Sequence, residues 1–376
     1  MALQNFDPQW FLDQVWQRKP LLLKAALPDY ECPLDGNDLA GLACEDGVDS
    51  RIILEKDGGW ELRNGPFIEE DFSTLPASNW TLLVQSVDHY LPELSELLAQ
   101  FRFIPRWRTE DIMVSYACDG GNVGPHFDQY DVFLVQGSGR RRWKIGAHCS
   151  ADTAISNHSG LRLLQDFTAE EEYLLEAGDV LYVPPGVAHW GVAEGDDCIT
   201  LSVGFRAPSE AALVSDFGDD IASFLDESIR YQDPQLDAKA HPAEISADVR
   251  QHVKSLIMRH IDNDAHLARW FGEMMTRIPD QESIIDDSLS PEAFLLELAE
   301  GAVLQLRLGA RLAFDEHYLF ADGLAFPYPP EQRDDVKSLC EIESGITIDT
   351  AHRLSPDMIY ALFCNGTLCF YDDTQD

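Results

Sequence analysis

Two side chains that commonly bind metals stand two residues apart in the segment GPHFDQYDVF, which contains His126 and Asp128. In an extended chain, residues i and i+2 point to the same face, so this pair could bind one metal ion. The apolar run DVFLVQ that follows favours an extended segment. A second pair, His260 and Asp262, falls at the end of a predicted helix, where the two side chains diverge by about 200°. Because the chain has 11 histidines and many aspartates, such pairs also arise by chance.

A third candidate ligand, His189, ends the segment GDVLYVPPGVAHW. A strand is predicted over residues 179–183, the run PPG forces a turn, and His189 follows where the next strand begins. A histidine in a Pro-Gly hairpin is also common for purely structural reasons. Two histidines and one carboxylate bind Fe(II) on one side and leave three coordination positions free, as in non-haem iron oxygenases. A structural zinc site would need four ligands, preferably thiolates. We therefore predict His126, Asp128 and His189 as the ligands of a catalytic iron.

One arginine of the segment GRRRWKIG is predicted to face the interior. The phase of the strand places Arg141 on the apolar face with Trp143, whereas Arg140 lies on the opposite face. A buried arginine needs an anionic partner. The partner could be an Asp or Glu elsewhere in the chain, or the distal carboxylate of 2-oxoglutarate held by two hydrogen bonds.

The two histidine segments resemble the two motifs of the cupins. The residues concerned are Gly120, His126, Asp128 and Gly137 in the first segment and Gly178, Pro184, Gly186 and His189 in the second. In metal-dependent isomerase cupins the position of Asp128 is a second histidine, and their glutamate would fall at Val132 or Phe133, neither of which can bind a metal. With Arg141 included, the chain resembles the jumonji-type 2-oxoglutarate oxygenases. The opening WFLDQVWQRKPLLLK and the run VGPHFDQYDVFLVQGSGRRRWKIG are similar to the bacterial ribosomal oxygenase subgroup, whose members hydroxylate an arginine of a large-subunit ribosomal protein.

This resemblance implies a fold that is mainly β plus α. It consists of a double-stranded β-helix (jelly-roll or cupin-like) catalytic domain, a helical dimerisation segment and a C-terminal winged-helix-like α+β domain. It also implies Fe(II) as the metal, 2-oxoglutarate bound by Arg141, O2 as cosubstrate, and release of succinate and CO2. The family places a hydroxyl residue nine positions before the first ligand, which is Ala117 here. Ser115, Thr200 or Ser202 could take its place.

A substrate arginine would need a carboxylate partner, and Asp119 and Asp131 flank the metal motif. The simpler interpretation is a turn at Asp119 and a solvated strand end at Asp131. A methyl-lysine demethylase with the same chemistry and a metal-binding cupin without redox chemistry remain alternatives. So does a scaffold protein that uses its helical segment and acidic domain as a binding surface.

The pattern of elements divides the chain into three parts. Residues 1–207 contain many short β segments and three short helices, near 8–17, 38–45 and 91–100, as in a sandwich or barrel. Residues 208–265 begin a series of three amphipathic helices, the last of which extends beyond 265, and their apolar stripes must be buried somewhere. They could cover the β domain or a second copy, and we expect a homodimer. Residues 266–376 read as a small α+β domain.

The charge of the chain limits its partners. The 376 residues carry a net charge of −39, which repels nucleic acid and attracts basic proteins, although such acidity can also reflect solubility alone. Residues 266–376 hold 7 Lys and Arg against 21 Asp and Glu, which argues against DNA binding by a winged helix. None of the eight cysteines forms a CxxC pair, and neither a signal peptide nor an apolar run of about 20 residues is present. We expect a cytoplasmic protein that does not associate with membranes.

Overall fold

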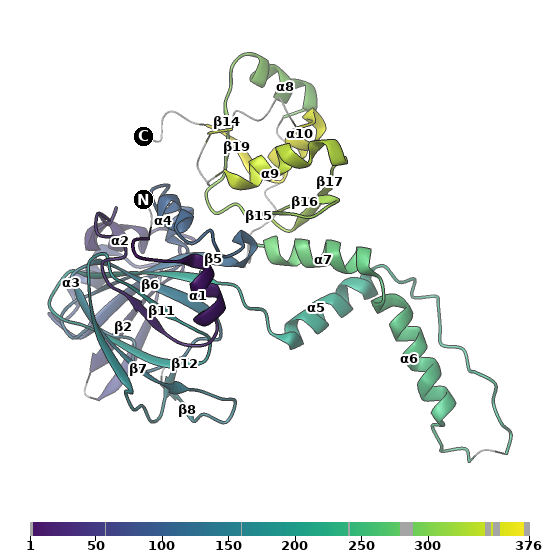
Figure 1. Ribbon diagram of the computed structural model, residues 1–376, viewed down its shortest axis with the longest axis horizontal. Helices are drawn as coiled ribbons and strands as arrows, with labels where there is room; N and C mark the ends of the chain where they lie inside the picture. Colours follow the sequence, from purple (N-terminus) through teal and green to yellow (C-terminus); the bar gives the residue numbers. More distant parts are fainter. Residues whose placement is uncertain are drawn as a thin grey trace.

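The computed structural model describes residues 3–56, 58–158, 160–239, 241–278, 289–342, 347–348 and 354–371. Within these residues the N-terminal half forms two facing β-sheets (Figure 1). The larger sheet has eight antiparallel strands in the order β1-β11-β6-β13-β5-β4-β2-β3, and the smaller has three in the order β10-β7-β12. The strands are β1 (Leu21–Leu23), β2 (Ser50–Lys56), β3 (Gly59–Asn64), β4 (Trp80–Val84), β5 (Thr109–Ala117), β6 (Asp131–Ser138), β7 (Arg140–His148), β8 (Ile155–His158), β9 (Leu161–Leu164), β10 (Glu171–Glu176), β11 (Val180–Val183), β12 (Val187–Ala193) and β13 (Cys198–Phe205).

The alternation of side chains along β6 separates two cores. Val132 and Leu134 point inward and pack against Trp143 and Ile145 of the smaller sheet. Phe133 and its neighbours point outward into a second core, which the short N-terminal helices cover. These elements are α1 (Pro8–Gln14), α2 (Gly36–Leu42), α3 (Glu69–Ser73), η1 (Val87–His89), α4 (Leu94–Ala99) and η2 (Arg106–Arg108). The double-stranded β-helix predicted from the sequence is therefore confirmed.

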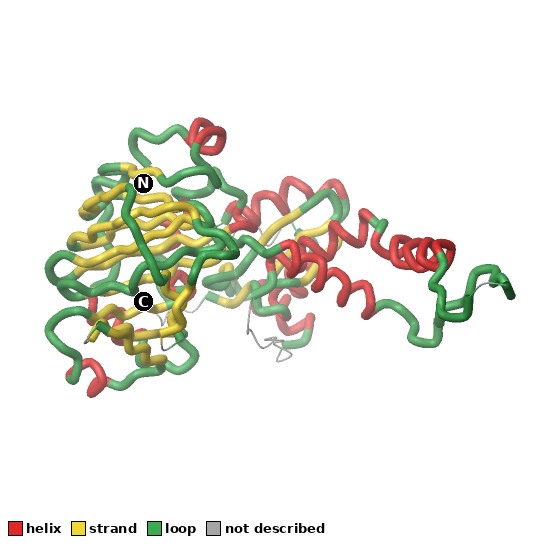
Figure 2. Tube along the Cα trace, turned by 90° about the horizontal axis from the view of Figure 1, so that it is seen from below, coloured by secondary structure: helices red, strands yellow, loops and turns green. Residues whose placement is uncertain are grey.

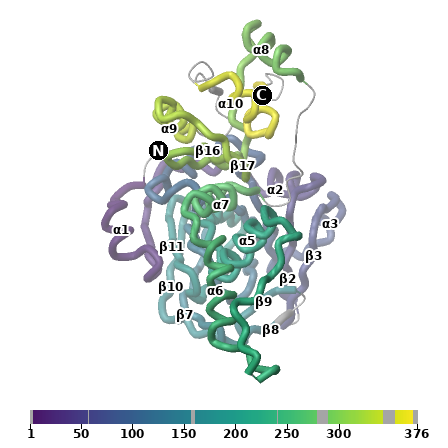
Figure 3. The backbone as a smooth tube through the Cα atoms, turned by 90° about the vertical axis from the view of Figure 1, so that its right-hand side faces the viewer, coloured from purple at the N-terminus to yellow at the C-terminus, as the bar shows by residue number. Residues whose placement is uncertain are grey.

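Three helices form an arm that leads away from the sheets: α5 (Glu210–Ser223), α6 (Ala247–Ile261) and α7 (Asp264–Thr276). The side chain of Ser209 accepts a hydrogen bond from the backbone N–H of Ala212 at 3.0 Å and so begins α5. Phe217 of α5 packs against Trp270 of α7, but α6 has no buried residue. Figure 2 shows the strands of the β domain at one end of the molecule and the arm at the other. Figure 3 looks along the arm.

The C-terminal part has its own apolar core, built around Phe294, Leu339 and Leu362. Two small three-stranded sheets, β18-β14-β19 and β15-β16-β17, lie beside short helices. The elements are α8 (Pro291–Ala299), β14 (Leu304–Leu306), β15 (Leu312–Phe314), β16 (Tyr318–Ala321), β17 (Leu324–Pro327), η3 (Pro330–Gln332), α9 (Arg333–Glu341), β18 (Thr347–Ile348), α10 (Pro356–Cys364) and β19 (Leu368–Phe370).

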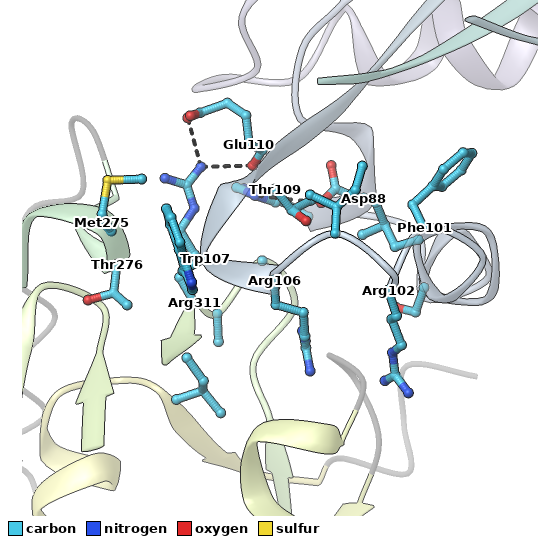
Figure 4. Close-up of a pocket in the computed structure, with 17 residues that line it drawn as sticks. Asp88, Phe101, Arg102, Arg106, Trp107, Thr109, Glu110, Met275, Thr276 and Arg311 are labelled. Carbon is cyan, nitrogen blue, oxygen red and sulfur yellow. Dashed lines mark hydrogen bonds and ion pairs between the residues drawn. The ribbon is translucent and has the colours of Figure 1, made fainter. Parts of the chain in front are cut away.

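Charged side chains join the C-terminal part to the β domain. Glu110 accepts a hydrogen bond from Arg206 at 2.6 Å. It accepts another from Arg311 at 3.0 Å, which Figure 4 shows. Arg206 also donates to the carbonyl oxygens of Met275 and Arg277 at the end of α7. Helix α7 thus contacts both neighbouring parts, and the predicted boundaries at 207 and 265 stay predictions.

Candidate metal centre

His126, Asp128 and His189 come together at one end of the space between the two sheets. Each offers one ligand atom, and these atoms all lie within 4.8 Å of one another. Nε2 of His189 is 3.5 Å from Oδ2 of Asp128. The side chains are thus spaced to bind a single ion, although their role as ligands stays a proposal.

Backbone hydrogen bonds hold the three residues in register. The N–H groups of His126 and His189 donate to each other's carbonyl oxygens at 3.0 and 2.8 Å. The N–H of Gly186 donates to the carbonyl oxygen of Asp128 at 2.7 Å. Gly186 adopts φ 78°, a conformation that favours glycine. The Pro-Pro-Gly turn is therefore hydrogen-bonded directly to the segment that carries Asp128.

Hydrogen bonds also orient the two imidazole rings. Nδ1 of His126 lies 2.9 Å from the carbonyl oxygen of Gly124, and Nδ1 of His189 lies 3.0 Å from that of Val187. A protonated Nδ1 donates in each case and leaves the lone pair of Nε2 free for a metal. Burial lowers the pKa of His189, with a further contribution from His126, which favours the neutral ring that a metal ligand needs.

A cavity of about 500 Å³ adjoins this cluster. The larger sheet contributes Met113, Ser115, Val132, Leu134, Thr200 and Ser202, and the smaller contributes Arg141, Trp143 and His189. The walls thus combine apolar side chains with polar and charged ones, and the polar groups could fix the orientation of a bound small molecule.

Arg141 is the buried cation of this cavity, as the strand phase predicted. Its residue is 3% exposed, Nε contacts Sγ of Cys198 at 3.5 Å, and Nη2 has no hydrogen-bond partner among the described residues. Among the described residues, no Asp or Glu forms a salt bridge with Arg141, so the alternative of an internal anionic partner has no support. A buried guanidinium with an unpaired N–H facing a cavity fits a bound carboxylate.

The position at which the family has a hydroxyl residue and the candidate replacements lie in different places. Ala117 is fully buried and is not among the cavity-lining residues. Ser115, Thr200 and Ser202 line the cavity, and Oγ of Ser115 is 3.4 Å from the carbonyl oxygen of Thr200. The hydroxyl of Thr200 donates to Oε1 of Gln136 at 3.2 Å, so its proton already has an acceptor within the protein.

The structure gives Asp131 a different role from the one we expected. Its side chain is fully buried, and it accepts hydrogen bonds from Tyr182 at 2.6 Å, Gln17 at 3.0 Å and Arg108 at 3.3 Å. Burial raises the pKa of this carboxyl, and its partners oppose that shift. Because Asp131 shares the outer face of β6 with Phe133, it cannot reach the cavity, and our interpretation of it as a substrate residue or solvated strand end is wrong.

Asp119 remains accessible at a turn. It accepts a hydrogen bond from the backbone N–H of Gly195 at 2.7 Å and is not among the cavity-lining residues. This contact is the turn-forming role that the sequence also suggested.

Two facing sheets, a cluster of two histidines and one aspartate, and a buried arginine in one cavity define the class of Fe(II)- and 2-oxoglutarate-dependent cupin-like dioxygenases. Comparison with known families agrees. Residues 96–213 match the JmjC domain, and residues 259–368 match the ROXA-like winged helix. Among the helices that the structure describes, none is long and apolar enough to span a membrane.

Known proteins resemble this chain along most of its length. Ribosomal protein uL16 3-hydroxylase of Escherichia coli is 36% identical over 331 residues, which cover 85% of this chain and 86% of the relative. The X-ray structure of E. coli ycfD is 33% identical, with a TM-score of 0.88 over 99% of this chain and 100% of that one. The E. coli YcfD complex with cobalt and 2-oxoglutarate is 32% identical, with a TM-score of 0.85, and the match covers 98% of this chain and 99% of that one. The chain therefore belongs to the ribosomal oxygenase family of JmjC-domain, 2-oxoglutarate-dependent dioxygenases.

Proposed function

We propose that this enzyme hydroxylates an arginine side chain of a basic ribosomal large-subunit protein and releases succinate and CO2. The observation that carries the proposal is the metal cluster sharing one cavity with the unpaired Arg141. The similarity to a uL16 3-hydroxylase supports a ribosomal substrate, and the net charge of −39 suits a basic one. A ribosomal substrate supports a cytoplasmic location, and the negative net charge argues against direct contact with nucleic acid.

Each group of the cavity has a distinct task in this proposal. His126, Asp128 and His189 would hold Fe(II), and Arg141 would bind the distal carboxylate of 2-oxoglutarate, with Ser115 and Thr200 beside it. When bound, iron and 2-oxoglutarate supply the chemistry that activates O2 and transfers one oxygen atom to a C–H bond of the substrate. The apolar walls at Met113, Val132 and Leu134 exclude water from the reacting groups.

One carboxylate remains as the proposed contact of the substrate arginine. Asp119 is the remaining candidate from the sequence for binding its guanidinium, since it is exposed and precedes the metal segment in the chain, whereas Asp131 is buried. One oxygen of Asp119 stays available beside its contact with Gly195.

We also propose that the protein is a homodimer formed through the helical arm. Val214, Leu236 and Ile257 are 75%, 67% and 53% exposed, and further large apolar side chains of this arm lie open to solvent. A second copy of the arm could bury these side chains, which single chains rarely expose in such number.

The purified protein tests the reaction directly. Incubation with Fe(II), 2-oxoglutarate, O2 and a uL16 peptide should add the mass of one oxygen atom to an arginine and yield succinate. Release of formaldehyde from a methyl-lysine peptide would instead identify a demethylase. Mass spectrometry of ribosomal proteins from cells with and without the gene would then show which residue is modified. Absence of any 2-oxoglutarate turnover would favour a metal-binding cupin or a scaffold.

A further inference from the structure

The cavity contains a second buried donor without a partner, the indole N–H of Trp143. The residue is 5% exposed and lines the cavity, and its Nε1 has no hydrogen-bond partner among the described residues. Nearly all buried N–H groups in folded proteins are paired, because an unpaired one loses its hydration without compensation. An orphaned donor on a cavity wall is therefore a sign that a ligand supplies the acceptor.

Trp143 stands between the two ends of the proposed cosubstrate site. It shares the inner face of β7 with Arg141, whose Cζ lies 5.8 Å from the centre of the indole. The centre of the His189 ring lies 5.8 Å from the centre of the indole, and His189 pairs with Ile145, two residues further along β7. A dicarboxylate that extended from the metal cluster to Arg141 would lie beside this indole.

The orientation of the indole is set by Gly191, its cross-strand neighbour in β12. A Cβ atom at Gly191 would lie 2.7 Å from Cζ3 and 2.8 Å from Cε3 and Cη2 of Trp143. The six-membered ring therefore packs against the backbone of Gly191, and a residue with a side chain at that position would displace it. Nε1 belongs to the five-membered ring and is not among the atoms that a Cβ atom at Gly191 would contact most closely.

We propose that Trp143 is a positioning residue for 2-oxoglutarate, whose indole N–H donates to the carboxylate that Arg141 binds. This inference rests on the proposed function. A carboxylate has about four lone-pair sites, more than the two N–H groups of Nη2 of Arg141 can satisfy, and the adjacent indole N–H would supply a third donor. The ring also forms an apolar wall along the carbon chain, which fixes the cosubstrate relative to the metal.

Replacement of the indole by a phenyl ring isolates the hydrogen bond. Trp143→Phe keeps an aromatic wall and should raise KM for 2-oxoglutarate at least about tenfold with little change in kcat. The dissociation constant, measured without oxygen from the visible charge-transfer absorption of the ferrous 2-oxoglutarate complex, should rise by the same factor. Trp80→Phe is the matched control, because Nε1 of Trp80 donates to the carbonyl oxygen of Pro76 outside the cavity, and both constants should stay unchanged.

Nuclear magnetic resonance of the wild-type protein gives a second test that does not depend on the variant's folding. With Zn(II) in place of Fe(II), one of the eight tryptophan indole N–H resonances should move downfield when 2-oxoglutarate is added. The same resonance should show a nuclear Overhauser effect to the cosubstrate methylene protons, and it should be missing in a folded Trp143→Phe protein. If 2-oxoglutarate binds but no indole resonance moves, the inference about Trp143 is wrong and the proposed function stands. If 2-oxoglutarate does not bind at all, the proposed function itself fails.

Discussion

Arg140 and Arg141 are neighbours in β7 with opposite environments, since Arg140 is exposed and Arg141 is buried on the cavity wall. Arg141→Ala removes the cation that would bind the distal carboxylate, a contact typically worth about 2–5 kcal/mol when buried. We expect KM for 2-oxoglutarate to rise roughly a hundredfold, measured by succinate release. Arg140→Ala should leave KM unchanged. Equal effects of the two substitutions would show that the inner arginine does not bind the cosubstrate.

Asp131 should affect stability and not substrate binding. In Asp131→Asn an amide group faces the donors of Gln17 and Arg108, so a buried network loses one of its acceptors. We expect the free energy of unfolding in urea to fall by about 2–4 kcal/mol. KM for the peptide, measured on the folded enzyme at low temperature, should not change.

Asp119→Asn is the comparison for this prediction, because its carboxylate lies at an exposed turn. Its effect on stability should stay below about 1 kcal/mol. An unchanged stability of Asp131→Asn together with a higher KM for the peptide would restore Asp131 as a substrate residue.

The contrast between the metal cluster and Asp131 shows what local sequence can predict about single residues. The spacing of His126 and Asp128 and the Pro-Pro-Gly turn before His189 are local patterns with a direct geometric meaning. The partners of Asp131 are 23, 51 and 114 residues away along the chain. Their proximity depends on the fold of the whole domain, so no local pattern could identify this network.

At the scale of elements, strand phase was the most informative signal. It placed Arg141 and Trp143 on the inner face of β7, and the structure confirms both positions. Strand phase gave no information about the junction between the β domain and the C-terminal part, where Glu110, Arg206 and Arg311 meet from segments that are far apart in the sequence. The chemistry of that junction became visible only in three dimensions.

Asp88 makes the stability of this junction depend on pH. It lines a small cavity there, and burial raises its pKa to about 7 from 3.8, with Asp111 adding to the rise (Figure 4). The unfolded chain therefore releases this proton at lower pH than the folded chain, and the associated stability is lost as the pH rises from about 4 to 7. Asp88→Asn can still accept the hydrogen bond from the backbone N–H of Ile112 but has no such titration.

The two proteins should differ in how steeply the free energy of unfolding changes with pH. Between pH 5 and pH 7 the wild-type free energy of unfolding should fall relative to that of Asp88→Asn, by at most about 1.4 kcal/mol per pH unit. Urea unfolding of both proteins across this range measures the difference. Parallel pH profiles would mean that Asp88 ionises at its ordinary pKa.

At the scale of the whole molecule, the apolar stripe of α6 tests the proposed dimer. Val253, Ile257 and Ile261 follow one another at intervals of four residues and are 40%, 53% and 42% exposed. Amphipathicity predicted that this stripe is buried, but nothing in the described chain covers it. We expect analytical ultracentrifugation to find a dimer, and Ile257→Asp to shift it towards the monomer.

Ser255→Asp adds the same charge two positions away, on another side of α6, and should leave the dimer intact. Its side chain donates only to the carbonyl oxygen of His252 within the helix. If the wild-type chain sediments as a monomer at micromolar concentration, the arm must have another role.

The net charge of −39 should influence how a basic substrate reaches the enzyme. Long-range attraction raises the rate of encounter and not the rate of chemistry, and it weakens when the Debye length falls from about 10 Å at 0.1 M salt to about 3 Å at 1 M. We therefore expect kcat/KM for a basic peptide to fall about tenfold or more between these concentrations of sodium chloride, while kcat changes little. Sucrose at matched osmolality should have no such effect, which separates screening from changes in hydration. A value of kcat/KM that is independent of salt would mean that the acidity serves solubility and that the peptide is recognised through short-range contacts alone.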